Sequence, residues 1–83
     1  MVTVHREFGF RVVIYPSGRE HGPPHVHVFN ADGEAKVSIG DADQAPGLLL
    51  VVGMRKQDAA RALRIVEARQ ETFLARWREY HGT

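Results

Sequence analysis

The chain lacks cysteine, a strong net charge and any long apolar run, and each absence excludes a class of protein. Its 83 residues contain no Cys, so we expect neither a disulfide framework nor a thiolate metal site. Eleven basic and ten acidic residues give a formal net charge of +1, unlike the strongly basic surface of a dedicated nucleic-acid-binding domain. No apolar run approaches the roughly 18 residues of a membrane-spanning helix. The first residues also lack the apolar segment of a secretory signal, so we expect a cytoplasmic protein without membrane contact.

The length fits one small domain over residues 1–83, with a sheet over about 8–52 and a helix over about 55–81. A domain of this size buries only about 60–65% of the surface of its unfolded chain, so its core is thin. A metal, a partner or self-association adds stability to such a domain, and we expect a homo- or hetero-oligomer. Charge is divided unevenly: the sheet half is acidic and residues 54–83 are basic.

Alternating apolar and polar residues predict three strands, over residues 8–15, 25–29 and 34–39. In the first strand, Phe8, Phe10, Val12 and Ile14 share one face. Residues 30–33 read as a hairpin turn. The apolar run over 48–52 is either a fourth strand that is buried on both faces or a segment that a partner covers.

From about Arg55 the apolar residues recur with a helical period and form one stripe. The stripe contains Ala59, Ala62, Leu63, Val66, Phe73, Leu74, Trp77 and Tyr80. Gln70 falls inside it, where its amide either orients a neighbouring group or reaches water at the edge of the fold, and we favour water. No Gly or Pro interrupts the run before Gly82, which favours one long helix, with a break near residues 68–70 as the alternative. These patterns predict an α+β domain: a small, mostly antiparallel sheet of three or four strands, packed on one face by a long C-terminal helix.

The sharpest local feature is the segment His-Gly-Pro-Pro-His-Val-His-Val over residues 21–28. His25 and His27 are two residues apart in a predicted strand, so both rings project from the same face. Two imidazoles on one face divide proton removal and delivery, as in metal-independent RNA cleavage, which makes this pair the candidate catalytic residues. Alternatively, His21, His25 and His27 bind a divalent metal such as zinc, or the rings only pack. No cofactor is favoured.

Further residues on the same predicted face suit the binding of anions, stacked bases or a protein surface. They are Arg11, Tyr15, Phe29 and Lys36. On the helix, Arg69 and Arg76 share one flank of the stripe. We expect them to contact phosphates, acidic residues of a partner or carboxylates of this chain. His81 at the helix end is a candidate surface contact, whereas Trp77 is most simply a core residue.

Five stretches of the chain also form a known pattern. They are residues 9–15, 20–28, 33–37, 53–54 and 73–82. Together they resemble the bacterial domain-of-unknown-function family four-one-six-zero over nearly the whole chain. The Pro-Pro-His-x-His-Val element and the terminal Trp and His-Gly are the specific parts. The characteristic residues of the family map to His21, Pro23, Pro24, His25, His27, Trp77 and His81. Residues 15–20 depart from the family, because relatives often hold Asn or Asp there.

The resemblance implies a small stand-alone protein of a kind often encoded beside a second short protein, in pairs proposed to be toxin–antitoxin modules. We therefore expect a cytoplasmic bacterial protein of toxin–antitoxin type that acts through a small cognate protein encoded nearby. RNA is the expected substrate if the chain is the toxin half. Two alternatives stay open: a non-catalytic binding or regulatory module, and a structural protein stabilised by histidine-bound metal.

Overall fold

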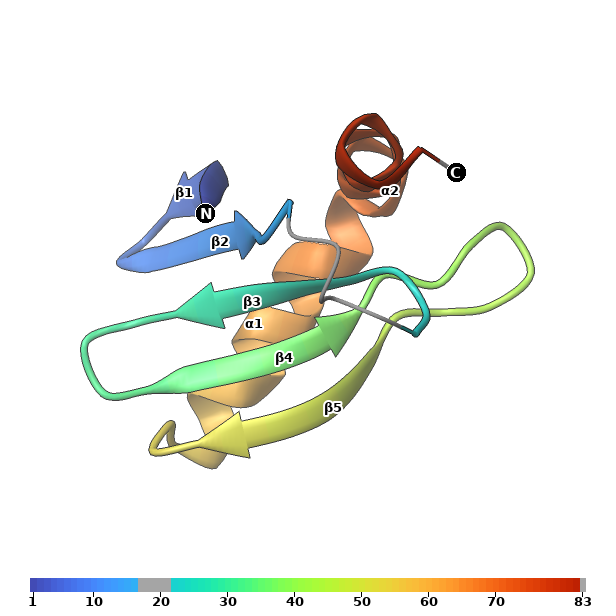
Figure 1. Ribbon diagram of the computed structural model, residues 1–83. Coiled ribbons are helices and arrows are strands. Elements are labelled where there is room, and N and C mark those ends of the chain that lie inside the picture. Colours follow the sequence, from blue (N-terminus) through green and yellow to red (C-terminus); the bar gives the residue numbers. More distant parts are fainter. Residues whose placement is uncertain (17–21, 83) are drawn as a thin grey trace.

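The computed structural model describes residues 1–16 and 22–82 and shows an α+β fold, as the sequence predicts (Figure 1). A single antiparallel sheet has the strand order β1-β2-β3-β4-β5, so each strand pairs with its neighbours in sequence. Two helices follow the sheet. The elements are β1 (Val2–Glu7), β2 (Phe10–Ile14), β3 (His25–Phe29), β4 (Glu34–Ser38), β5 (Gly47–Val52), α1 (Lys56–Ala68) and α2 (Gln70–His81).

The sheet has five strands in the described residues, so the prediction of three or four was too low. The sequence pattern missed β1 and placed Phe8 inside a strand whose first residue is in fact Phe10. Phe8 and Gly9 have φ angles of +45° and +83° and form the two-residue turn between β1 and β2. The alternation of Phe8 with Phe10 is therefore incidental, because a residue with positive φ cannot continue a strand.

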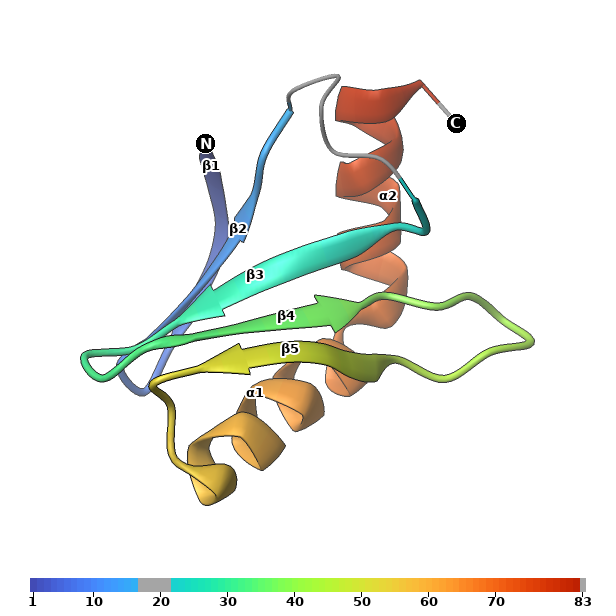
Figure 2. The ribbon, with the colours of Figure 1, turned by 60° about the horizontal axis from the view of Figure 1, so that its bottom comes forward.

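The C-terminal segment forms two helices, so the single long helix was wrong and the alternative break near residues 68–70 is what the structure has. The backbone of Arg69 is not helical, with φ −128° and ψ 27°. Its N–H donates a hydrogen bond to the carbonyl oxygen of Val66 at 3.1 Å. In Figure 2, α1 crosses one face of the sheet and α2 then turns steeply along the sheet's end. The break lets Phe73 and Trp77 bury their rings against the sheet.

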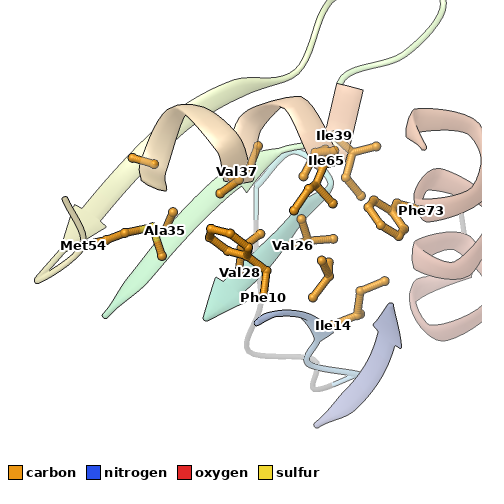
Figure 3. Close-up of a cluster of buried hydrophobic side chains, with 14 of the residues drawn as sticks. Phe10, Ile14, Val26, Val28, Ala35, Val37, Ile39, Met54, Ile65 and Phe73 are labelled. Carbon is orange, nitrogen blue, oxygen red and sulfur yellow. The ribbon is translucent and has the colours of Figure 1, made fainter. Parts of the chain in front are cut away.

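The core lies between the helices and one face of the sheet (Figure 3). Val26 and Val28 of β3, Val37 of β4 and Val66 of α1 are fully buried there. The predicted apolar stripe faces this core, with Leu63, Leu74 and Tyr80 packed at its margin. No helix within residues 1–16 and 22–82 is long and apolar enough to cross a membrane.

Gln70 does not simply reach water, which corrects the interpretation that we favoured. Its amide Nε2 donates to the carbonyl oxygens of Ile39, Asp41 and Gln44 at 2.9, 2.9 and 3.0 Å. The side chain therefore fixes the loop that leads from β4 into β5 against the start of α2.

Candidate functional site

Three neighbouring strands bring the predicted sheet residues together on the face opposite α1. The register pairs Arg11 with Phe29 across β2 and β3, and His27 with Lys36 across β3 and β4. The intervening residues, such as Val12 and Val28, point into the core. We name this surface the imidazole face. It consists of Arg11, Tyr15, His25, His27, Phe29, Glu34 and Lys36.

The rings on the imidazole face form a contiguous row centred on His27. The ring of Tyr15 meets it edge-on at 4.8 Å between centroids, and the ring of Phe29 lies parallel to it at 6.5 Å. The guanidinium carbon of Arg11 lies 5.6 Å from the centre of the Phe29 ring, within cation–π range. Cationic, aromatic and imidazole groups therefore adjoin one another on one side of the sheet.

A carboxylate orients His27. The Nδ1 atom of His27 lies 2.8 Å from Oε2 of Glu34, and the two side chains are 14% and 36% exposed. Because an ionised carboxylate only accepts hydrogen bonds, the Nδ1 atom of His27 carries a proton and donates it to Glu34. This arrangement resembles the carboxylate–imidazole pairs that set the tautomer of catalytic histidines.

Glu34 was missed as a site residue when the sequence was considered alone. The sequence nevertheless contains a feature that predicts the position of Glu34, namely the hairpin turn over residues 30–33. That turn pairs Phe29 with Glu34, and it therefore places Glu34 diagonally across from His27. The turn is held by Asn30, whose side-chain oxygen accepts hydrogen bonds from the N–H groups of Asp32 and Gly33, both at 2.9 Å.

His25 is buried rather than open to a substrate. Its side chain is 2% exposed, and its Nδ1 donates to the carbonyl oxygen of Pro23 at 3.1 Å. Its ring lies between those of His27 and Trp77, at centroid distances of 5.3 and 5.0 Å. The geometry therefore does not support an accessible pair of catalytic histidines and favours His27 with Glu34 instead.

The remaining candidate residues of α2 and its flank engage groups of this chain. His81 hydrogen-bonds the carbonyl oxygen of Tyr15 at 3.1 Å and stacks on Trp77 at 3.7 Å. Arg69 pairs with a carboxylate oxygen of Glu7 at 3.6 Å.

Arg76 is also held within the chain. It pairs with Glu79 at 3.2 Å and donates to the hydroxyl of Tyr80 at 2.8 Å. The hydrogen bond to Tyr80 raises the pKa of the Arg76 guanidinium, which stays charged.

The zinc hypothesis stays a prediction. His21, one of its three ligands, lies outside the described residues. Within residues 1–16 and 22–82, no group of three or more His, Asp or Glu side chains is arranged to hold a metal ion.

A second surface stands out along β5. Its five large apolar residues are exposed, so the prediction of a strand buried on both faces was wrong for this chain. The exposed fractions are Leu48 41%, Leu49 50%, Leu50 56%, Val51 39% and Val52 55%. Among the residues that the structure describes, β5 is an edge strand that pairs with β4 alone, and its register shifts opposite Lys36 and Val37.

Residues 9–78 match the model of a family described as a domain of unknown function (DUF4160), the family that the sequence resembles. No curated protein and no solved structure matches the chain.

Proposed function

The chain belongs to the DUF4160 family, and we propose that it functions by binding a protein partner along β5. The observation that carries this proposal is a run of five exposed apolar residues on an edge strand. Following the resemblance, the partner is a small cognate protein encoded nearby, and the two form a toxin–antitoxin pair. The basic C-terminal half favours a partner that is acidic beside its docking segment.

The outer edge of β5 suits the addition of another strand. Soluble proteins protect such edges with charged residues, proline or a covering element. The segment Gly47–Val52 contains no charged residue and no proline. A partner strand that pairs with this edge completes its backbone hydrogen bonds, which is the usual mode of strand addition.

Both faces of β5 offer apolar contacts to the same partner. Leu50 and Val52 lie opposite Lys36 and Glu34 and therefore extend the imidazole face, whereas Val51 lies opposite Ala35 on the core side. Covering the exposed half of each large side chain contributes on the order of 1 kcal/mol per residue. We therefore expect the partner to supply an extended segment with apolar residues on both of its faces.

Co-expression with the product of the neighbouring gene tests this proposal. The wild-type chain should co-purify with that protein, and Leu50→Lys should lose the complex while its unfolding temperature is preserved. Ala75→Lys, which adds the same charge at an exposed position of α2, is the matched control and should bind normally. Failure of the wild-type complex, or equal recovery with Leu50→Lys, would contradict the proposal.

The 2.8 Å contact between His27 and Glu34 supports a second candidate function, metal-independent RNA cleavage. In this reaction His27 takes the proton of a ribose 2′-hydroxyl, the 2′-oxygen attacks the adjacent phosphorus, and the 5′-oxygen leaves with a proton from water. Glu34 holds the imidazolium that forms, while Arg11 and Lys36 attract the phosphodiester.

Growth arrest on expression tests the second candidate. His27→Gln and Glu34→Gln should both relieve the arrest at unchanged protein level. His5→Gln is the control, because His5 packs against Phe73 on the other side of the sheet. Equal toxicity of His27→Gln and wild type would exclude the role of His27 as the base.

A further inference from the structure

The turn between β1 and β2 holds an aromatic ring in an unfavourable position. Phe8 is 86% exposed, and it is the only non-glycine residue with positive φ among the described residues. Two-residue hairpin turns with positive φ at both positions strongly prefer Asn-Gly or Gly-Gly. A phenylalanine gains no burial here and strains the backbone. Strain of this kind is characteristic of binding sites.

Like charges adjoin the same turn. Arg6 lies directly opposite Arg11 across β1 and β2, and such a like-charge pair destabilises a sheet. On the other side of Phe8, Arg61 and Arg64 of α1 line a pocket of about 440 Å³ together with the ring. Within residues 1–16 and 22–82, Arg6, Arg61 and Arg64 form no ion pair.

One acidic residue, Glu7, lines the same pocket, where its carboxylate is shared with two other cationic or imidazole groups. The carboxylate of Glu7 is held by His5 at 2.9 Å and by Arg69 at 3.6 Å. The turn therefore presents one exposed ring between two pairs of arginines, which we name the hairpin tip: Arg6, Phe8, Arg11, Arg61 and Arg64.

We propose that the hairpin tip binds single-stranded RNA, with a base stacked on Phe8 and phosphates held by the flanking arginines. Single-stranded nucleic acids are recognised in this way, by aromatic faces set within basic grooves. A single exposed ring provides little area for a membrane, whereas it matches the face of one base. This site goes beyond partner binding at β5 and does not depend on it.

The tip is also connected to the imidazole face. Arg11 belongs to both surfaces and lies over Phe29, whose ring is parallel to that of His27. The β1–β2 turn and the β3–β4 turn lie at the same end of the sheet (Figures 1 and 2). An RNA strand that is bound at the hairpin tip is therefore directed toward His27 and Glu34, although binding at the hairpin tip does not require cleavage.

Fluorescence anisotropy with a labelled single-stranded oligoribonucleotide of mixed sequence tests the stacking role. Phe8→Asn should lower the affinity roughly tenfold, the effect of losing one base stack. Asn accepts positive φ, so this variant should unfold at the same temperature as wild type or higher. Phe8→Trp should retain the affinity because it keeps an aromatic face. Leu50→Lys, on the opposite edge of the sheet, should bind RNA at least as tightly as wild type.

Salt dependence tests the phosphate contacts. Arg61→Gln and Arg64→Gln should each reduce the slope of log affinity against log salt by about 0.7 if the side chain contacts one phosphate. Arg78→Gln removes the same charge from an exposed position of α2 and should leave the slope unchanged.

Three results would overturn the proposal. Unchanged RNA affinity of Phe8→Asn would remove the stacking role. Equal affinity for duplex and single-stranded RNA would show that no base is stacked. Binding to phosphatidylserine vesicles without binding to RNA would assign the tip to a membrane surface. These outcomes concern the tip alone, since the β5 complex and the growth assay report on the other sites independently.

Discussion

The amide of Gln70 offers a sharp test of how α2 holds the loop before β5. Its Nε2 lies 2.9 Å from the carbonyl oxygens of Ile39 and Asp41 and 3.0 Å from that of Gln44. An amide nitrogen carries two hydrogens, so the three contacts amount to two hydrogen bonds, one of which is shared. Replacing Gln70 by Ala removes both donors at once.

The free energy of unfolding that Gln70→Ala loses depends on whether water can replace the missing amide at each carbonyl oxygen. The contacts to Asp41 and Gln44 are exposed, so water replaces the amide there, whereas the contact to Ile39 is partly buried. A hydrogen bond contributes about 1 kcal/mol net. We therefore expect Gln70→Ala to lower the free energy of unfolding by about 1–2 kcal/mol, which corresponds to roughly 5–10 °C in Tm.

Gln70→Glu should destabilise the protein more than Gln70→Ala at neutral pH. An ionised carboxylate only accepts hydrogen bonds, so it repels the carbonyl oxygens that the amide nitrogen contacts. Lowering the pH protonates the carboxyl group and restores one donor, so the difference between the two variants should narrow in acid.

Urea unfolding followed by circular dichroism measures all of these free energies. Gln57→Glu is the control, because Gln57 is exposed in the first turn of α1, where an acidic residue is tolerated. The reasoning is refuted if the free energy of unfolding of Gln70→Ala lies within about 0.3 kcal/mol of wild type, because that difference is well below the contribution of one hydrogen bond. It is also refuted if Gln70→Glu is the more stable variant at neutral pH.

Three further predictions concern packing and the edge strand. Gly33→Ala should cost about 2 kcal/mol in urea unfolding, because its Cβ would overlap the carbonyl oxygen of Val52, while Gly47→Ala has room and should cost little. Trp77→Ala should cost about 3–5 kcal/mol in the same assay, since the indole is 4% exposed; a loss below 1 kcal/mol would contradict its place in the core. Without its partner, the wild-type chain should self-associate with rising concentration in sedimentation experiments, and Leu50→Lys should stay monomeric.

Much of the sheet could be predicted because its signals are local. The turn over residues 30–33 and the alternation on either side of it define β3 and β4, whose bounds lie close to those predicted. Period-two alternation also places His27, Lys36 and Phe29 on one face, and the register has them there. The diagonal contact with Glu34 was missed because it depends on how two strands are aligned, not on either strand alone.

The errors have a different physical origin. The turn at Phe8 lacks a favoured turn dipeptide, so the alternation of apolar residues outweighed Gly9. The break at Arg69 carries no Gly or Pro and keeps the apolar stripe in phase, so only the packing of Phe73 and Trp77 against the sheet reveals it. The run over 48–52 looks buried because its residues are apolar, yet none of the residues that the structure describes covers it.

The way α2 is attached has a consequence for folding kinetics. The helix is fastened to the loop after β4 by Gln70 and to the end of β2 by His81, across sequence separations of 31 and 66 residues. The hairpins of the sheet form from neighbours in sequence, whereas these contacts require long loops to close first. Docking of α2 is then a late step, and weakening it should accelerate unfolding while leaving the folding rate nearly unchanged. The lifetime of the native state is therefore governed by the last helix.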